Sequence, residues 1–187
     1  TEKPEQTATT TQPDCRSGPQ SALSRYWELE AGSDCGRFNI RGYRPISLSV
    51  IGSDSVNQAP SSPTAGHTAT SEQPYLTGEA RIQLSVRTKI ASGFLTHDDP
   101  VKRDSLWFGY TQQSFWQVYD QQGSRPFRET NYNPELFFDF VRPLESLPDL
   151  HLQFGLEHES NGRAPELSRS WNRVYLWPRY DLGPAQI

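Results

Sequence analysis

Apolar and polar residues alternate along much of this chain. The clearest stretch is EARIQLSVRTKI at 79–90, where the odd-numbered positions are all polar and most even-numbered positions are apolar. An alternation with period two over this length predicts a β-strand with one apolar and one polar face. Related patterns predict five further strands at 38–51, 105–119, 136–141, 150–160 and 168–177. Because no segment has a convincing helical period, the predicted fold class is all-β.

The six predicted strands follow one another without intervening helices, which favours antiparallel pairing of successive neighbours. Their polar faces carry Arg, Lys, Gln and Glu, a pattern that a soluble β-sandwich and a membrane barrel share. The length of the strands and their long aromatic segments favour the barrel, with an apolar exterior and a polar interior. We therefore predict an antiparallel transmembrane β-barrel.

Two segments have no periodicity. Residues 1–24 are rich in Thr, Gln, Pro and Ser and are predicted to be a disordered lead-in. Residues 52–74 form a second low-complexity stretch and are predicted to be a long loop. The barrel domain is accordingly predicted to span 25–187. Because the chain contains no methionine and begins TEKPEQ, we expect a processed chain or a fragment.

The amino-acid composition is compatible with the predicted β-barrel. Hydrophobic residues make up only 34% of the chain, and no run of 18 apolar residues is present, so no transmembrane helix is predicted. Transmembrane strands need only about 9–11 residues each and alternate in polarity, so a low mean hydropathy is compatible with them. The net charge of −4, without a basic stripe, gives no indication of nucleic-acid binding.

The cysteine content leaves two alternatives open. Cys15 and Cys35 are the only cysteines, and two thiols without a histidine at ligand spacing cannot form a zinc site. They form a disulfide if the chain resides in an oxidising compartment, and otherwise they remain two unpaired thiols.

Candidate chemistry lies in the stretch EHESNGR at 157–163. His158 and Ser160 continue an apolar face that begins at Leu152, because residues two apart in a strand point the same way. If the next predicted strand pairs with this one, Asn172 comes opposite His158. A serine becomes a nucleophile when a base takes its proton, and the base works best when a third group orients it. Polar groups on an apolar, lipid-facing surface are costly and tend to be functional.

Several ordered motifs resemble the outer-membrane phospholipase A family. They are YTQQS (110–114), SRPFRETNY (124–132), HESNGR (158–163) and SRSWNRVY (168–175), with WELE near Trp27 before the first strand. The resemblance implies a twelve-stranded antiparallel barrel in the outer membrane of a Gram-negative bacterium, with residues 1–24 on the periplasmic side. It implies calcium-dependent hydrolysis of phospholipid acyl esters, of the phospholipase A1/A2 type, by a homodimer that dimerisation activates.

The resemblance also assigns roles at the candidate site. It implies that Ser160 is the nucleophile, His158 the general base and later acid, and Asn172 the residue that orients the histidine. The oxyanion site is then built from the Gly162 backbone N–H and a calcium-bound water. On spacing alone, a histidine and a serine two apart on a strand are more often ordinary surface residues.

The remaining implied positions concern calcium and the dimer. The resemblance implies one calcium per monomer at the dimer interface, held by Ser124, the carbonyl of Arg163, and Ser168, while Gln112 hydrogen-bonds across that interface. Taken alone, the two serines are typical of turns and Arg163 is a solvated loop charge. A calcium site without a carboxylate is expected to be weak.

The chain departs from the family in one respect. Six strands do not close a barrel of twelve, and the sequence after Tyr175 reads LWPRYDLGPAQI, where Pro178 and Pro184 disfavour a central strand. We therefore expect the N-terminal half of a barrel, either a fragment or a natural truncation, that is inactive unless completed. Calcium-dependent hydrolysis by these 187 residues alone would contradict that expectation.

Two other function classes remain open from the sequence. One is a non-catalytic outer-membrane barrel, porin-like or structural, in which His158 and Ser160 are incidental. The other is a soluble β-barrel that binds a small apolar ligand inside. The side of the sheet on which the 152–160 face lies tests the soluble-barrel alternative. In a soluble barrel His158 and Ser160 would be buried in a core.

Overall fold

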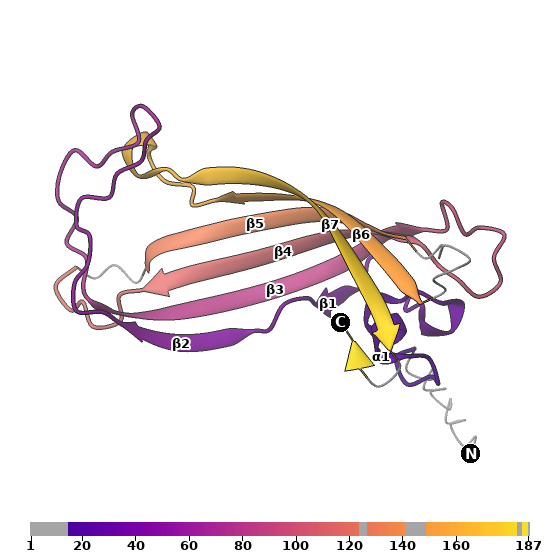
Figure 1. Cartoon of the computed structure of the whole chain (residues 1–187). Helices are drawn as coiled ribbons and strands as arrows, with labels where there is room; N and C mark the ends of the chain where they lie inside the picture. The colour runs from indigo at the N-terminus through magenta and orange to yellow at the C-terminus, as the bar shows by residue number, and fades with distance from the viewer. Residues whose placement is uncertain (1–14, 124–126, 141–148, 183–184, 187) are drawn as a thin grey trace, which may run out of the picture.

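The computed structural model describes residues 15–123, 127–140, 149–182 and 185–186 (Figure 1). In chain order the elements are α1 (Ala22–Trp27), the 3₁₀ helix η1 (Ala31–Ser33), β1 (Ile40–Gly42), β2 (Ser47–Gly52), β3 (Gly78–Ser92), β4 (Ser105–Trp116), β5 (Phe127–Phe140), β6 (Leu150–Ser160), the 3₁₀ helix η2 (Pro165–Leu167), β7 (Ser170–Leu182) and β8 (Ala185–Gln186).

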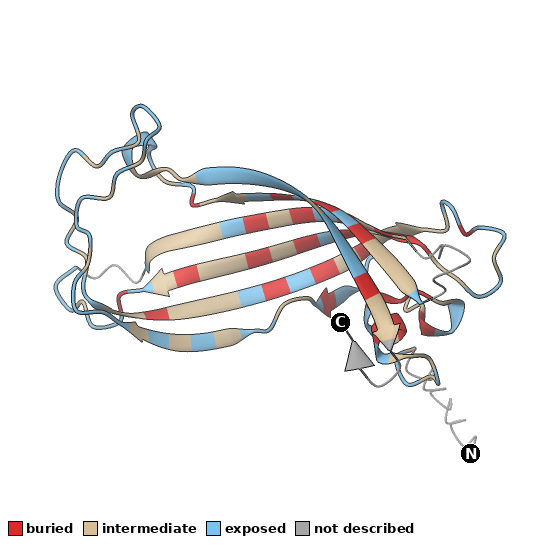
Figure 2. Cartoon of the chain, viewed as in Figure 1, coloured by how far each residue is buried: buried red, intermediate tan, exposed pale blue. Residues whose placement is uncertain are grey.

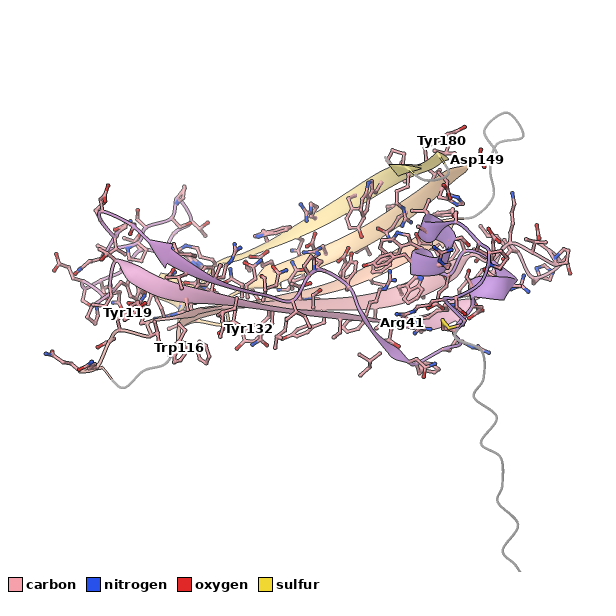
Figure 3. The ribbon with its side chains drawn as sticks, turned by 90° about the horizontal axis from the view of Figure 1, so that it is seen from below. Arg41, Trp116, Tyr119, Tyr132, Asp149 and Tyr180 are labelled. Carbon is pink, nitrogen blue, oxygen red and sulfur yellow. A yellow bond between two sulfur atoms is a disulfide. The ribbon has the colours of Figure 1, made fainter. Side chains whose placement is uncertain are left out.

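The described strands form one antiparallel sheet in the order β1-β3-β4-β5-β6-β7-β8, with β2 pairing farther along the same edge of β3. Successive neighbours pair as the sequence predicts, and the all-β fold class is confirmed. Seen from below, β6 and β7 curl out of the plane of the other strands, so the sheet forms a trough (Figure 3). None of the helices in the described part of the chain is both long and apolar enough to cross a membrane.

Three predicted strands differ from the structure by a break or by more than three residues at one end. The strand predicted at 38–51 is split into β1 and β2. The strand predicted at 136–141 is the end of a longer one, because Pro134 and the polar residues before it hide the alternation of β5. Pro178 lies inside β7 instead of ending it. A proline is tolerated there because no described strand pairs with the outer side of β7 before Asp181.

The two faces of the sheet differ sharply in burial (Figure 2). On the concave face Trp107 and Phe137 are almost fully buried, together with charged side chains such as Glu135 and Glu157. Arg44 links these two carboxylates at 3.1 Å and 3.2 Å. The convex face carries exposed apolar side chains on every long strand, including Leu84, Phe108, Leu136, Leu156 and Val174. The trough therefore has a polar, hydrogen-bonded interior and an apolar exterior, as predicted.

The N-terminal segment folds into one end of the trough. Leu23, Trp27 and Leu29 are buried against Trp107 and Phe137 of the sheet. The prediction of a disordered lead-in to residue 24 is therefore wrong from Cys15 onward, because α1 begins at Ala22 and is buried on one side. Residues 1–14 lie outside the described part of the chain. The helix was missed because a six-residue helix is too short for its apolar period to be distinguishable.

A buried ion cluster joins this segment to the sheet. Glu28 has no exposed surface and accepts a hydrogen bond from Arg41 at 3.1 Å. Its other neighbours are the ammonium of Lys89, at 2.7 Å, and the backbone N–H of Cys35, at 3.0 Å. Lys89 also pairs with Asp34 at 2.7 Å. Because charges in the interior must be paired, this cluster fixes where the segment docks.

The break between β1 and β2 turns two side chains into the trough. Gly42 pairs with Val86 and Ser47 pairs with Gln83, so four residues of the edge strand oppose two residues of β3. Tyr43 lies inside this bulge and stacks on Phe137 with a ring-centroid distance of 5.4 Å. Arg44 follows it into the interior. A bulge of this kind redirects side chains without ending the sheet.

Of the two alternatives for Cys15 and Cys35, the structure shows the disulfide. Cys15 and Cys35 are joined by a disulfide, drawn in yellow near Arg41 in Figure 3. The bond closes a loop across 20 residues, and constraining such a loop in the unfolded chain is worth about 3 kcal/mol.

We expect replacement of both cysteines by serine to lower the free energy of unfolding by about 3 kcal/mol, because the unfolded chain regains that conformational freedom. Urea unfolding in detergent micelles measures this. Reduction should destabilise the wild type and leave the double variant unchanged. Equal unfolding midpoints for the two proteins under oxidising conditions would contradict the expectation.

Candidate active site

His158 and Asn172 face each other across two neighbouring strands. They are a directly opposed pair in the β6–β7 register. The Nδ1 atom of His158 lies 2.8 Å from the side-chain oxygen of Asn172. Because an amide oxygen can only accept, Nδ1 carries the hydrogen, and the lone pair of the neutral ring is on Nε2. The imidazole is thus oriented with its basic nitrogen away from the asparagine.

This pair lies on the convex face of the sheet. Phe154, Leu156 and His158 are exposed, whereas Gln153 and Glu157 at the alternate positions are buried in the trough. The predicted parity of β6 is therefore confirmed. It argues against a soluble barrel with an apolar core, since in such a fold the 152–158 face would be the buried one.

Ser160 follows on the same strand and is half-buried. It is the register partner of Ser170 on β7 and of Tyr132 on β5. In the described structure no hydrogen bond joins Ser160 to His158. Residues two apart on a strand have Cα atoms about 6.6–6.8 Å apart, so rotation of the side chains can bring the hydroxyl to Nε2. Contacts of this kind are often long before substrate binds.

The turn after Ser160 is organised by Asn161, whose role the sequence did not reveal. Its side chain donates to the Leu167 carbonyl at 2.8 Å and accepts from the Arg169 N–H at 2.9 Å. Its own N–H donates to the Arg169 carbonyl at 3.1 Å. The Asn-Gly pair predicts a turn, but no pattern in the neighbouring sequence predicts that the Asn161 side chain bonds to Leu167 and Arg169. Because its N–H is engaged, Asn161 is not an oxyanion donor.

Gly162 differs from Asn161 in this respect. Its N–H has no acceptor among the described residues, and its φ of 61° is a conformation that glycine adopts without strain. A Cβ atom at this position would lie 3.3 Å from the ring of Tyr132. A glycine is therefore needed for both reasons, and its N–H remains available to an incoming oxyanion.

The predicted calcium positions are only partly described. Ser124 lies outside the described residues. Arg163 and Ser168 both lie in the turn between β6 and β7, which we call the 161–169 hairpin. The Ser168 carbonyl accepts from the guanidinium of Arg169 at 2.7 Å and from Nδ1 of His67 at 3.0 Å. Within the described residues neither the Ser168 hydroxyl nor the Arg163 carbonyl has a hydrogen-bond partner.

These oxygens suit calcium in kind, because calcium prefers hydroxyl, carbonyl and water oxygens. Across the described ranges no three His, Cys, Asp or Glu side chains group as metal ligands. The fit therefore depends on neutral oxygens.

Gln112 lies on the convex face of β4, as its predicted parity requires. Its side chain accepts from the Tyr110 hydroxyl at 3.1 Å and donates to the Ser114 hydroxyl at 3.2 Å. Across the sheet Gln112 is opposite Tyr132, which is opposite Ser160. A row of polar groups thus crosses an otherwise apolar surface and reaches the candidate nucleophile.

An open groove of about 400 Å³ adjoins His158 and Asn172 on this surface. Its apolar lining comes mainly from four neighbouring strands, with Phe108 on β4, Leu136 on β5, Leu156 on β6 and Val174 on β7. An apolar groove beside the His158–Asn172 pair can accept a hydrocarbon chain.

Comparison with known proteins places these residues in context. A family model described as phospholipase A1 matches residues 23–184. A curated relative from Neisseria meningitidis, described as a putative phospholipase A1, is 37% identical over 175 residues. That match covers 88% of this chain and 44% of the relative, so the chain spans less than half of the relative's length.

Two solved structures have similar folds. The outer membrane phospholipase dimer of Salmonella typhi with bound calcium superposes with a TM-score of 0.59 at 30% identity, over 76% of this chain and 52% of that one. An asparagine-to-alanine active-site mutant of outer membrane phospholipase A from Escherichia coli gives 0.60 at 28% identity, over 78% and 54%. The chain thus spans about half of each solved protein.

Proposed function

The chain belongs to the phospholipase A1 family, of the Gram-negative outer membrane, and we propose that it carries the catalytic residues of a calcium-dependent serine hydrolase. The substrate is the acyl ester of a phospholipid. The observation that carries this proposal is the His158–Asn172 hydrogen bond on the lipid-facing side of the sheet, with Ser160 next along the same face. The catalytic residues face outward because the substrate is the surrounding lipid.

The reaction follows from the orientation of these groups. Asn172 holds Nδ1–H, so Nε2 of His158 takes the proton of Ser160 as its Oγ attacks the ester carbonyl carbon. His158 then gives that proton to the oxygen of the departing lysophospholipid. Water, deprotonated by the same imidazole, next attacks the acyl-serine and releases a fatty acid. The neutral asparagine suits a lipid-facing site, where a carboxylate would be costly.

The negative charge that develops on the carbonyl oxygen needs a donor. The Gly162 N–H, which has no acceptor among the described residues, lies one residue beyond Asn161 and is the candidate. A preorganised donor of this kind contributes about 10²–10³ in rate in other acyl-transfer sites. Calcium, when bound, would add positive charge beside that oxyanion. The Ser168 hydroxyl and the Arg163 carbonyl, with Ser124, would hold it.

The groove beside His158 gives the substrate class a physical basis. Its apolar lining is open to the convex surface, so an acyl chain can enter laterally from the membrane. Gln112 and the polar row on β4 and β5 are costly to expose to lipid, which supports their burial against a second copy. Dimerisation through this row would cover both the polar groups and part of the groove, which gives a reason for activation by dimerisation.

The test of this proposal uses a joined protein, in which residues 1–182 are followed by the part of the Neisseria meningitidis relative beyond its matched region. We expect a sulfonyl fluoride to label Ser160 in mixed micelles with calcium, and chelation of calcium to reduce the labelling rate at least about a hundredfold, the lower limit for losing one oxyanion-stabilising group. Peptide mass spectrometry locates the label. A heat-dependent shift in gel mobility confirms that the barrel is closed.

The unjoined chain serves as the comparison, and we expect no label on it. Absence of label from the folded joined protein would contradict the proposed hydrolase and favour a non-catalytic barrel. Label on a residue other than Ser160 would contradict the assignment of the nucleophile.

A further inference from the structure

The segment 53–77 between β2 and β3, which we call the β2–β3 arm, rises from one edge of the sheet and reaches the 161–169 hairpin (Figure 1). Its two limbs are joined by backbone hydrogen bonds, from Gln73 to Gln58 at 2.7 Å and from Ala69 to Pro60 at 2.9 Å. Leu76 is anchored to the side chain of Gln117 at 2.6 Å. The arm is therefore an ordered excursion with a defined tip.

That tip presents His67 to the hairpin. Gly66 has a φ of 78°, and the His67 N–H bonds to the Thr64 carbonyl at 3.1 Å, which closes a tight turn. The ring atom Nδ1 then lies 3.0 Å from the Ser168 carbonyl oxygen. A carbonyl can only accept, so Nδ1 donates this hydrogen bond. His67 and Ser168 are 101 positions apart in the sequence. The contact joins the loop after β2, at one edge of the sheet, to the turn before β7, near the other edge.

The other hydrogen bonds to the Ser168 backbone are local. Its N–H donates to Pro165 at 3.3 Å, and its carbonyl accepts from the neighbouring Arg169 at 2.7 Å. These contacts shape the hairpin but cannot fix it relative to the rest of the sheet. Among the described hydrogen bonds to this residue, only that from His67 comes from a distant element.

Apolar packing does little to replace that contact. A cavity of about 290 Å³ lies between the arm and the hairpin, lined by Pro60 and Tyr75 on one side and Leu167 and Arg169 on the other. Because the two segments are separated by this space, a lost hydrogen bond is not compensated by close contact of apolar side chains.

We propose that His67 is a positioning residue for Ser168, and that the β2–β3 arm is a clasp that holds the 161–169 hairpin ready for calcium. This inference rests on the calcium site of the proposed function. The histidine fixes the Ser168 peptide, and the peptide in turn sets the direction of the Ser168 hydroxyl. The clasp thereby links the β2–β3 arm to the 161–169 hairpin beside Ser160. In the sequence this arm is recognisable only as a low-complexity segment.

Two variants of the joined protein test the clasp. His67→Ala removes the donor, while His67→Asn retains one, because the asparagine Nδ2 is placed on the side chain as Nδ1 is in histidine. Loss of one hydrogen bond corresponds to about a 2- to 10-fold effect. We expect His67→Ala to weaken calcium binding by that factor in a calorimetric titration, and His67→Asn to restore it.

A second measurement needs no calcium. Hydrogen exchange followed by mass spectrometry, on the chain in micelles and on the joined protein, reports the amides of Leu167, Ser168 and Arg169. We expect exchange to be about 2- to 10-fold faster in His67→Ala and normal in His67→Asn. His97→Ala is the matched control, because it removes an exposed histidine at the opposite end of the sheet and should change neither quantity.

The outcomes separate the clasp from the calcium site itself. Unchanged exchange and unchanged calcium affinity in His67→Ala would overturn the clasp. Faster exchange with unchanged affinity would overturn the positioning role. If the wild type binds no calcium, the calcium site of the proposed function fails, whereas faster exchange in His67→Ala would still support the clasp as the support of the hairpin.

Discussion

Replacing Ser160 by alanine in the joined protein is expected to lower the rate of fatty-acid release by at least about a thousandfold, because the proposed acyl intermediate forms on its hydroxyl. His158→Ala should cost about as much, and the double variant should lose no more than either alone, since the two residues act as one unit. Release of fatty acid from mixed micelles, measured by titration of the acid, gives the rates.

Ser170→Ala is the matched control for this experiment. Ser170 lies directly opposite Ser160 on the neighbouring strand and faces the same surface. Its removal should change the rate less than about threefold, a barrier change of under 1 kcal/mol. Activity retained in Ser160→Ala, or lost equally in Ser170→Ala, would show that the nucleophile has been misassigned.

The second large effect concerns stability. Glu28→Ala is expected to lower the free energy of unfolding by about 3–5 kcal/mol, because it leaves the buried guanidinium of Arg41 without its carboxylate and Lys89 with Asp34 alone. Burial acts to raise the pKa of Asp34, but hydrogen bonds from Lys89 and Gly36 lower it below the usual value, so this carboxylate stays charged. Asp34 pairs with Lys89, and none of the described ion pairs joins it to Arg41, so it does not replace Glu28 there.

Urea unfolding of the folded chain in micelles measures this change. Glu72→Ala, which removes an exposed carboxylate from the β2–β3 arm, is the control and should shift the free energy by less than about 0.5 kcal/mol. A Glu28→Ala variant as stable as that control would mean that the buried cluster is not what fixes the N-terminal segment.

The alternation of apolar and polar residues was enough to predict the face of the sheet on which the candidate site lies. Strand parity alone put His158 with the exposed apolar residues of β6, and a short turn before β7 put Asn172 opposite it. Both inferences need only that the side-chain period is two and that neighbouring strands pair. The fold class followed from the same alternation, repeated over successive segments of the chain.

What could not be predicted depends on partners far away in sequence. Phe137, Glu135 and Glu157 stabilise the inward orientation of the Tyr43 and Arg44 side chains. The residues next to the bulge have no pattern that predicts this orientation. The start of β5 was hidden because its residues bond within a polar interior instead of alternating with apolar ones. The His67–Ser168 contact joins a loop with no periodicity to a turn 101 residues later.

The bulge between β1 and β2 limits how this part of the chain can vary in related proteins. Ile40 and Leu48 lie on opposite sides of it and both are exposed on the convex face. If β2 slipped by one residue against β3, Leu48 and Val50 would enter the polar interior and Ser47 and Ser49 would turn out to the hydrocarbon. Homologous sequences that differ in length here should therefore take up the difference inside the bulge and keep Leu48 opposite Ile82.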